Sequence, residues 1–248
     1  MRRIRLTVAY DGTEFHGWQI QPGQETVQGW LARVASGLEG ASVDLQGSGR
    51  TDAGVHAVGQ VAALSISNPI PVDNLVRAMN RLLPTSIRVM DACEVHPHFH
   101  PRFDALRKTY QYRICRAAVC PPMRRLYVCH HPYPLDEPMM QECAALIEGE
   151  HDFSAFAAAD EKDDLGRSKV RRIFSSRYRR EGDELVYEVC GSGFLKHMVR
   201  FLAGTLLETG KGNICPGGIR ARLQPDFPDK AGPSLPSCGL CLMKVEYD

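Results

Sequence analysis

Apolar residues recur along this chain with two different periods, and the order in which the periods alternate most constrains the fold. Residues 4–10 are apolar at every second position, as in a strand, whereas residues 27–38 carry apolar side chains three or four apart, as in a helix. Further strands are predicted over 43–45, 58–67 and 87–95, and a second helix over 71–83. The resulting order of strand, helix, strand, strand, helix, strand is typical of a ferredoxin-like unit.

A similar succession begins near Lys108, in element order only, because the two parts share no sequence similarity. Strands are predicted over 110–114, 127–129, 173–178, 185–190 and 240–247, and helices over 136–147 and 195–207. Residues 157–168 predict a flexible surface loop, and residues 210–236, rich in glycine and proline, an irregular segment. We therefore expect an α+β chain of two halves, residues 1–104 and 105–248.

Composition excludes several classes of protein. The 44% hydrophobic and 24% charged residues are ordinary for a globular chain, and no apolar run approaches the ~20 residues of a membrane span. The basic N-terminus runs directly into a short strand-like stretch, without the apolar core of a signal peptide. We expect a cytoplasmic protein that does not associate with membranes.

Basic residues are gathered in two segments, although the net charge is only +1. Residues 167–180 contain seven cations and no acid, and residues 102–116 contain five cations against Asp104 alone. Each segment is compatible with a solvated strand face. Together they favour a polyanionic partner.

Metal binding is not expected. Nine cysteines are scattered without a disulfide framework, which suits reduced thiols in a cytosolic protein. Cys238 and Cys241 form a CxxC, but no second pair of ligands follows to complete a zinc site. The alternating histidines at 96, 98 and 100 could also ligate a metal, but like the CxxC they form only part of a site.

The segment from Gly47 to Gln60 is the strongest candidate for chemistry, because it is a glycine-rich turn that contains Arg50, Asp52 and His56. In an extended segment Arg50 and Asp52 leave the same face, and the permanent cation keeps the carboxylate ionised. Such an aspartate can be a nucleophile, a base, a metal ligand or half of a salt bridge that pins the turn. The loop alone leaves these roles open.

Several familiar sites are excluded by the same segment. It lacks the Gly-Lys-Ser/Thr of a phosphate-binding loop, and it leads into a strand instead of the helix of a dinucleotide fold. No GxSxG elbow occurs in the chain. A glycosidase needs a second carboxylate, which is missing near Asp52.

Two other segments contain residues that could take part in binding or catalysis. Residues 108–112, KTYQY, alternate aromatic residues as a buried strand does, yet Tyr110 beside Lys108 also suits a base-stacking platform. Residues 194–200, FLKHMVR, predict the start of a helix with Lys196 and Arg200 four residues apart on one face. Two like charges so aligned are unfavourable unless an anion lies between them, either an RNA phosphate or a carboxylate such as Asp52.

These segments resemble the tRNA pseudouridine synthase A family, whose signature is similar to RTDAGVHA at 50–57 followed by Gly59 and Gln60. Further blocks that resemble the family are YDGTEFHGWQIQ at 10–21, FHPRF at 99–103, KTYQY at 108–112, HDFSAF at 151–156, FLKHMVR at 194–200 and GLCL at 239–242. The blocks run nearly end to end in family order. Departures fall in the 157–168 loop, the segment before the last strand and the cysteines of that strand.

The resemblance implies the pseudouridine synthase fold, with two ferredoxin-like halves joined through a central mixed, mainly antiparallel sheet on which helices pack. It implies isomerisation of uridine to pseudouridine at positions 38, 39 and 40 of the anticodon stem-loop of tRNA. It also implies a homodimer with a basic cleft for tRNA, and neither a cofactor nor a metal.

The resemblance further implies roles for individual residues. Asp52 matches the catalytic aspartate, Tyr110 the tyrosine that stacks on the flipped base, and Arg50 the arginine that displaces the target nucleotide. Arg200 matches the basic residue that pairs with the aspartate, and Leu195 a substrate-binding position. Additional RNA contacts are expected from His56, Lys108, Lys196, Arg171 and Arg172. Attack of Asp52 on ribose C1′, attack on the uracil ring and proton abstraction all remain open.

Two other functions fit parts of the pattern. A non-catalytic RNA-binding module can be built from ferredoxin-like halves, but such a module gains nothing from a carboxylate that faces phosphate. A nucleoside hydrolase needs a second carboxylate or a metal site, and the sequence offers neither.

Overall fold

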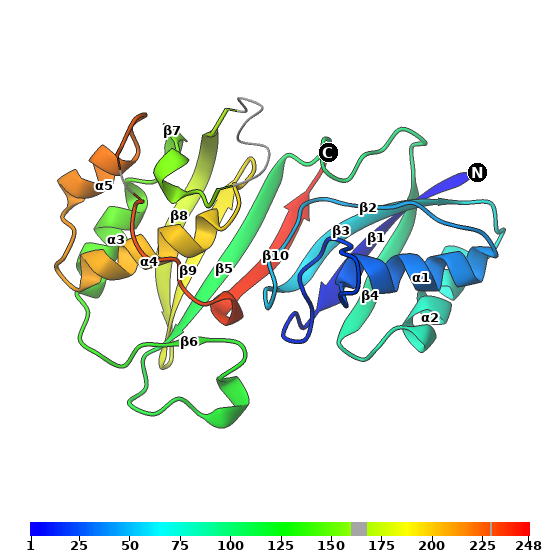
Figure 1. The fold of residues 1–248 in the computed structure, drawn as a ribbon, viewed down its shortest axis with the longest axis horizontal. Coiled ribbons are helices and arrows are strands. Elements are labelled where there is room, and N and C mark those ends of the chain that lie inside the picture. Colours follow the sequence, from blue (N-terminus) through cyan, green and yellow to red (C-terminus); the bar gives the residue numbers. More distant parts are fainter. Residues whose placement is uncertain (160–167, 229) are drawn as a thin grey trace. The chain divides into compact units, whose positions relative to one another are not determined.

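The computed structural model of the chain describes residues 1–159, 168–228 and 230–248 (Figure 1). The chain divides into an N-terminal unit, Met1–Leu106 with Cys241–Asp248, and a central unit, Arg107–Leu240. The expected halves, 1–104 and 105–248, differ from this division at the C-terminal end, because the last strand belongs to the N-terminal unit.

The N-terminal unit contains a sheet and two helices in the predicted order. Its elements are β1 (Arg2–Tyr10), α1 (Val27–Glu39), β2 (Leu45–Gly47), β3 (His56–Ile66), α2 (Val72–Leu82), β4 (Ile87–Val95) and β10 (Leu240–Glu246). Strand β1 pairs antiparallel with β4 on one side and β3 on the other, and β2 pairs antiparallel with β3. Strand β10 adds to β3 in parallel.

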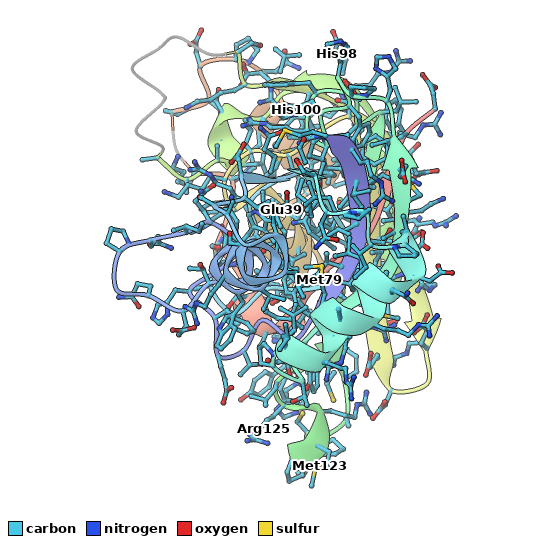
Figure 2. All side chains as sticks on the ribbon, turned by 90° about the vertical axis from the view of Figure 1, so that its right-hand side faces the viewer. Glu39, Met79, His98, His100, Met123 and Arg125 are labelled. Carbon is cyan, nitrogen blue, oxygen red and sulfur yellow. The ribbon has the colours of Figure 1, made fainter. Side chains whose placement is uncertain are left out.

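The core of this unit follows from the sequence periods. Ile4, Leu6 and Val8 of β1 are fully buried, as the alternation requires. Helix α1 begins after Thr26, whose hydroxyl accepts a hydrogen bond from Gly29 N and so caps the helix. Met79 of α2 is fully buried beside the sheet (Figure 2).

Gly59 lets the last strand approach the sheet. A Cβ atom at residue 59 would lie 2.3 Å from the carbonyl oxygen of Met243 in β10. Because real Cβ atoms never come so close, a side chain here would push β10 away from β3. The glycine that follows the RTDAGVHA motif is therefore explained by sheet assembly.

The central unit contains five strands of the sheet and three α-helices among its described residues. Its elements are β5 (Arg107–Cys115), β6 (Cys129–His130), α3 (Glu137–Ala145), β7 (Gly149–Asp152), β8 (Val170–Glu181), β9 (Glu184–Gly191), α4 (Met198–Gly210), α5 (Pro216–Arg222) and short 3-10 helices at Pro122–Arg124, Ser154–Phe156 and Ser237–Gly239. Strands β5, β9, β8 and β7 are antiparallel neighbours in that order, and β6 pairs in parallel with β5.

Three tyrosines form a row across this sheet on its buried face. Tyr112 of β5 is in register with Tyr187 of β9, which is in register with Tyr178 of β8. The Tyr187 hydroxyl lies 2.9 Å from that of Ser176, and the Tyr112 hydroxyl donates to Pro236 O at 2.7 Å. Burial raises the pKa of Tyr112 and Tyr187 above the ordinary range, so both stay protonated.

Some elements differ from the sequence expectations. The helix expected over 195–207 begins only at Met198, because His197 has a left-handed backbone with φ of 60°. Strand β7 was not predicted, and the segment expected to be irregular contains α5. Residues 160–167 of the expected 157–168 loop lie outside the described residues.

No helix in the described part of the chain combines the length and apolarity needed to cross a bilayer. The longest helices, α1 and α4, have 13 residues each.

Candidate active site

A buried amide fixes the start of the loop between β2 and β3. The Ser48 hydroxyl donates to Gln60 Oε1 at 2.6 Å, and Gln60 Nε2 donates to Gly49 O at 3.0 Å. Ser48 N also donates to Val61 O at 2.8 Å. Since Gln60 is fully buried, its carboxamide ties the loop to the rigid part of β3.

The N-terminal block fixes the middle of the same loop. The Tyr10 hydroxyl lies 2.7 Å from Thr51 Oγ1, and Trp18 N donates to Thr51 O at 3.0 Å. Gly17 has φ of 84°, and a Cβ atom there would lie 2.6 Å from Thr51 O. The two sequence blocks at 10–21 and 47–60 are thus structural partners, which is why both carry glycines.

The end of the loop is held by His56. Its Nδ1 accepts a hydrogen bond from Gly12 N at 3.1 Å and lies 3.2 Å from Asp11 Oδ1. The ring is buried against this turn. His56 therefore has a visible role in shaping the loop, and its expected contact with RNA stays a prediction.

Asp52 occupies the centre of this scaffold. Its carbonyl accepts from Val55 N at 3.1 Å, and its side chain is half-buried. Arg50 is exposed, and its Nε donates to Gln19 Oε1 at 3.1 Å. Main-chain contacts and the side chains of Gln60 and Tyr10 therefore shape the turn.

Tyr110 lies in the central unit, on β5 opposite Val189 of β9. Its ring is 8% exposed and meets the ring of Phe194 edge to face, with centroids 5.1 Å apart. The structure thus brings together two of the sequence-predicted segments, residues 108–112 and 194–200. Lys108 is half-buried two residues before Tyr110.

Arg200 and Leu195 belong to the same segment as Phe194. Arg200 is half-buried in the first turn of α4, and its Nε donates to Leu235 O at 2.7 Å. Leu195 is half-buried immediately before the helix. This hydrogen bond fixes the stem of Arg200.

The expected alignment of Lys196 with Arg200 is wrong. Lys196 precedes α4, so helical i, i+4 spacing does not apply. Its Nζ instead donates to Ala159 O at 3.1 Å, while its carbonyl accepts from Ala158 N.

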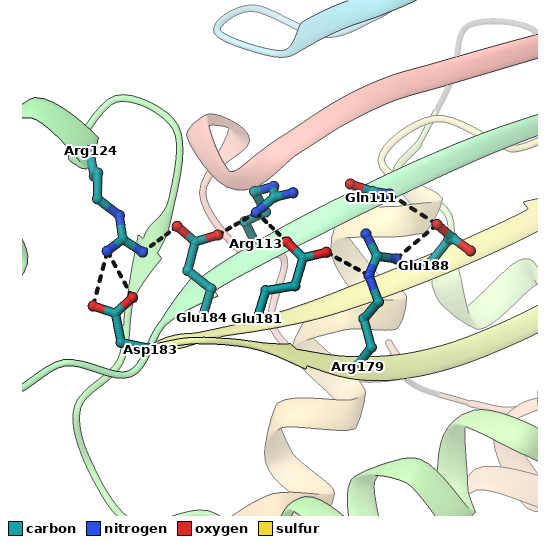
Figure 3. A network of polar contacts seen from close by, with 8 residues as sticks. All are labelled: Gln111, Arg113, Arg124, Arg179, Glu181, Asp183, Glu184 and Glu188. Atoms are coloured by element: carbon teal, nitrogen blue, oxygen red, sulfur yellow. Dashed lines mark hydrogen bonds and ion pairs between the residues drawn. The ribbon is translucent and has the colours of Figure 1, made fainter.

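Acids neutralise three of the seven cations in the predicted basic segment 167–180, and Figure 3 shows one of the three, Arg179, with its partners Glu181 and Glu188. Arg179 pairs with Glu181 and Glu188, and Arg177 pairs with Glu188, which lies directly opposite it in the register. Arg180 pairs with Glu137 of α3. These arginines form a structural network, so counting cations along the chain overestimated the basic surface.

The same network extends to the second basic segment. Arg113 pairs with Glu181 and Glu184, and Arg124 pairs with Asp183 and Glu184. The cations at the start of β8 differ. Arg171 Nη1 donates to backbone carbonyls, and Arg172 is exposed; Arg167 lies outside the described residues.

Among the described residues, no three histidine, cysteine or acidic side chains gather as metal ligands do. His98 and His100 lie on the segment after β4 (Figure 2), and His100 Nδ1 accepts from Arg102 N at 3.1 Å. The nine cysteines are free thiols.

The fold is α+β, and the Asp52 carboxylate lies on a loop that is held from both sides. A family model described as tRNA pseudouridine synthase matches residues 6–104 and 143–248. The chain therefore belongs to the tRNA pseudouridine synthase family and has the predicted fold of that family.

Curated relatives agree along the whole chain. The tRNA pseudouridine synthase A of Solibacter usitatus is 58% identical over 247 residues, which span 100% of both chains. Proteins of the same name from Pelobacter propionicus and Bacillus pumilus are 44% and 42% identical, over 100% and 99% of both chains respectively.

Sequence reasoning named candidate reacting residues but not the contacts that hold them. Gln60, Thr51 and Tyr10 hold the loop; all three stand in motifs quoted from the sequence, but none was given this role. A signal was present for Gln60, because an amide inside the otherwise apolar β3 must find buried partners.

Proposed function

We propose that this chain isomerises uridine to pseudouridine in tRNA, at positions 38, 39 and 40 of the anticodon stem-loop. The full-length similarity to proteins named tRNA pseudouridine synthase A supports the substrate. One observation carries the assignment of the site: Asp52 lies in a loop whose backbone is fixed by Tyr10, Trp18 and Gln60. A preorganised carboxylate is what a nucleophile requires.

The reaction conserves every atom. The bond between uracil N1 and ribose C1′ breaks, the uracil turns, and a bond between C5 and C1′ forms. The proton on C5 leaves and N1 takes up a proton, so no oxidant, reductant or co-substrate is required. In the proposed mechanism Asp52 acts as the nucleophile, either on C1′ or on the uracil ring, and water is kept out while the detached base turns.

The remaining roles follow the family resemblance. A uridine within a stem must first leave its stack, which costs a few kcal/mol. We propose that Arg50 assists this displacement and that stacking on Tyr110 returns roughly 1–3 kcal/mol. Arg200 is proposed to stabilise the ionised aspartate, and Leu195 to contact the base.

We further propose that the protein acts on tRNA in the cytoplasm as a homodimer. Lys108, Arg171, Arg172, Lys196 and His56 remain proposed RNA contacts. Of these, Arg172 is the exposed one on β8.

The decisive experiment compares Asp52→Asn with Asp44→Asn. Asp44 is an exposed aspartate just before β2, so the control makes the same chemical change near the loop. Tritium release from C5-labelled uridine in tRNA measures turnover, and filter binding measures affinity for the same tRNA. We expect Asp52→Asn to lose turnover by at least about 10³-fold while binding tRNA like the wild type, and Asp44→Asn to match the wild type.

Substantial turnover by Asp52→Asn would refute its role as nucleophile. A wild-type protein that binds tRNA without releasing tritium would instead be an RNA-binding module. Release of free uracil would identify a hydrolase.

A further inference from the structure

Cations on β8 divide into two groups along the strand. Arg177, Arg179 and Arg180 at its end each have a carboxylate partner. Arg172 at its start has none among the described residues, although Glu150 of β7 is its register neighbour. Arg107, at the start of β5, is likewise exposed and without an ion pair in the described part of the chain.

Both of these arginines lie at one aromatic ring. The Arg107 guanidinium carbon is 5.0 Å from the centroid of Phe174, and that of Arg172 is 6.0 Å from it. Phe174 is 37% exposed, which is high for a phenylalanine within a strand. We call these three residues the Phe174 patch.

A β-bulge presents this ring to solvent. The pairing of β8 with β9 shifts register between Ile173 and Ser175, so Phe174 is the extra residue. Ile173 is buried, and its neighbours Arg172 and Phe174 are both exposed. The backbone of β8 therefore places Arg172 and Phe174 on the exposed face.

The patch is separate from the candidate substrate site. Arg107 and Tyr110 are three residues apart on β5, so their side chains leave opposite faces of the strand. Tyr110 is buried beside Phe194, whereas Arg107 is exposed.

Two guanidinium groups near one ring, with no acid of the described residues bound to either, repel each other. Together they carry ten N–H donors. A phosphate relieves this repulsion and accepts bidentate hydrogen bonds from arginine. An exposed aromatic ring offers a stacking surface for a flat base. A nucleic acid supplies both groups.

We propose that Arg107, Arg172 and Phe174 form an accessory RNA site, which binds a phosphate and an unstacked base outside the nucleotide that is isomerised. The proposal rests on tRNA being the substrate. It assigns to the Phe174 patch a part in affinity and none in the chemical step.

The test compares two double variants of equal charge. Arg107→Gln with Arg172→Gln removes the two unpaired cations, and Arg177→Gln with Arg179→Gln removes two cations already neutralised by Glu188. Binding of an unmodified tRNA transcript is measured from 50 to 200 mM salt. Loss of the one neutralised phosphate lowers the magnitude of the slope of log K against log salt by roughly 0.7–0.9, and we expect this for the first pair only.

Phe174→Leu tests the stacking component. We expect about tenfold weaker tRNA binding with an unchanged salt slope, a raised KM and an unchanged kcat. Tyr133→Leu removes another exposed aromatic side chain of the central unit and serves as control. Thermal unfolding of each variant shows whether the strand is intact.

Wild-type activity separates the possible failures. If the wild type modifies tRNA and the patch variants bind like it, the accessory site is refuted while the proposed function stands. If the wild type neither binds nor modifies tRNA, the proposed function itself fails. A change in sedimentation with unaltered tRNA affinity would make the patch a protein interface and overturn the proposal.

Discussion

The phenol oxygen of Tyr10 lies 2.7 Å from the hydroxyl oxygen of Thr51, the residue directly before Asp52. Tyr10 ends β1 and is 4% exposed, so its position is set by the sheet. Thr51 also has its carbonyl held by Trp18 N. The first strand of the chain therefore helps to position the proposed nucleophile, Asp52, through Thr51.

Tyr10→Phe is expected to lower kcat about tenfold or more with little change in KM, because a small displacement of a reacting group is costly. Tyr187→Phe is the matched control, since it removes a similar buried hydroxyl pair, with Ser176, from the central unit. Both variants should lose roughly 1 kcal/mol of unfolding free energy. An equal loss of kcat in both would show that stability alone is responsible.

Gln60→Leu should lower the free energy of unfolding by roughly 2–4 kcal/mol, since it leaves the Ser48 hydroxyl and Gly49 carbonyl without their buried partner. Gln141→Leu is the control, because Gln141 is exposed and accepts one hydrogen bond, from Tyr178 N. Urea denaturation followed by circular dichroism measures both. The account of the loop is contradicted if the two substitutions cost the same.

Gly17→Ala and Gly23→Ala separate backbone strain from steric contact. Both glycines have positive φ, of 84° and 71°, so each alanine costs roughly 1–2 kcal/mol. Only at residue 17 does the new Cβ meet another atom, Thr51 O; at residue 23 nothing lies within 4 Å. We therefore expect Gly17→Ala alone to impair tritium release, and unimpaired turnover would show that the loop tolerates the displacement.

Glu188 makes stability depend on pH. Burial opposes its ionisation, but hydrogen bonds from Gln111, Arg177 and Arg179 outweigh burial and lower its pKa. The folded protein thus binds this proton more weakly than the unfolded chain. The stabilisation is complete above the unfolded pKa of about 4.3 and is lost as pH falls through the lower folded pKa.

Glu188→Gln should therefore flatten the pH dependence of the unfolding free energy below about pH 5. Glu142→Gln, on the exposed side of α3, is the control. Urea titrations at several pH values measure the unfolding free energy of both variants. If the wild type and Glu188→Gln show the same pH dependence, the ionised Glu188 does not stabilise the fold.

Local patterns predicted most elements of the fold. The Thr26 cap, the alternation in β1 and the Asp136 cap of α3 all act through neighbours within a few residues, so the sequence displays them directly. The positive φ of His197 was not visible, because non-glycine residues adopt it only when surrounding structure requires it. The start of α4 was misplaced for that reason.

Long-range pairing explains the other differences. Glu188 neutralises Arg177 and Arg179 from the next strand, and a count along one strand cannot reveal this. For the candidate site, the sequence singled out Asp52 and Tyr110 through their motifs. It did not show that Gln60 and Tyr10 hold the loop, since those contacts exist only once the sheet has formed.

The parallel pairing of β10 with β3 has a consequence for biosynthesis. Cys241 and Leu242 align with His56 and Ala57, which directly follow the loop that carries Asp52. A ribosome makes the whole central unit between these two strands, so the start of β3 lacks this neighbour while the central unit is being synthesised. Protection of that part of β3 becomes possible only after the whole central unit has been made.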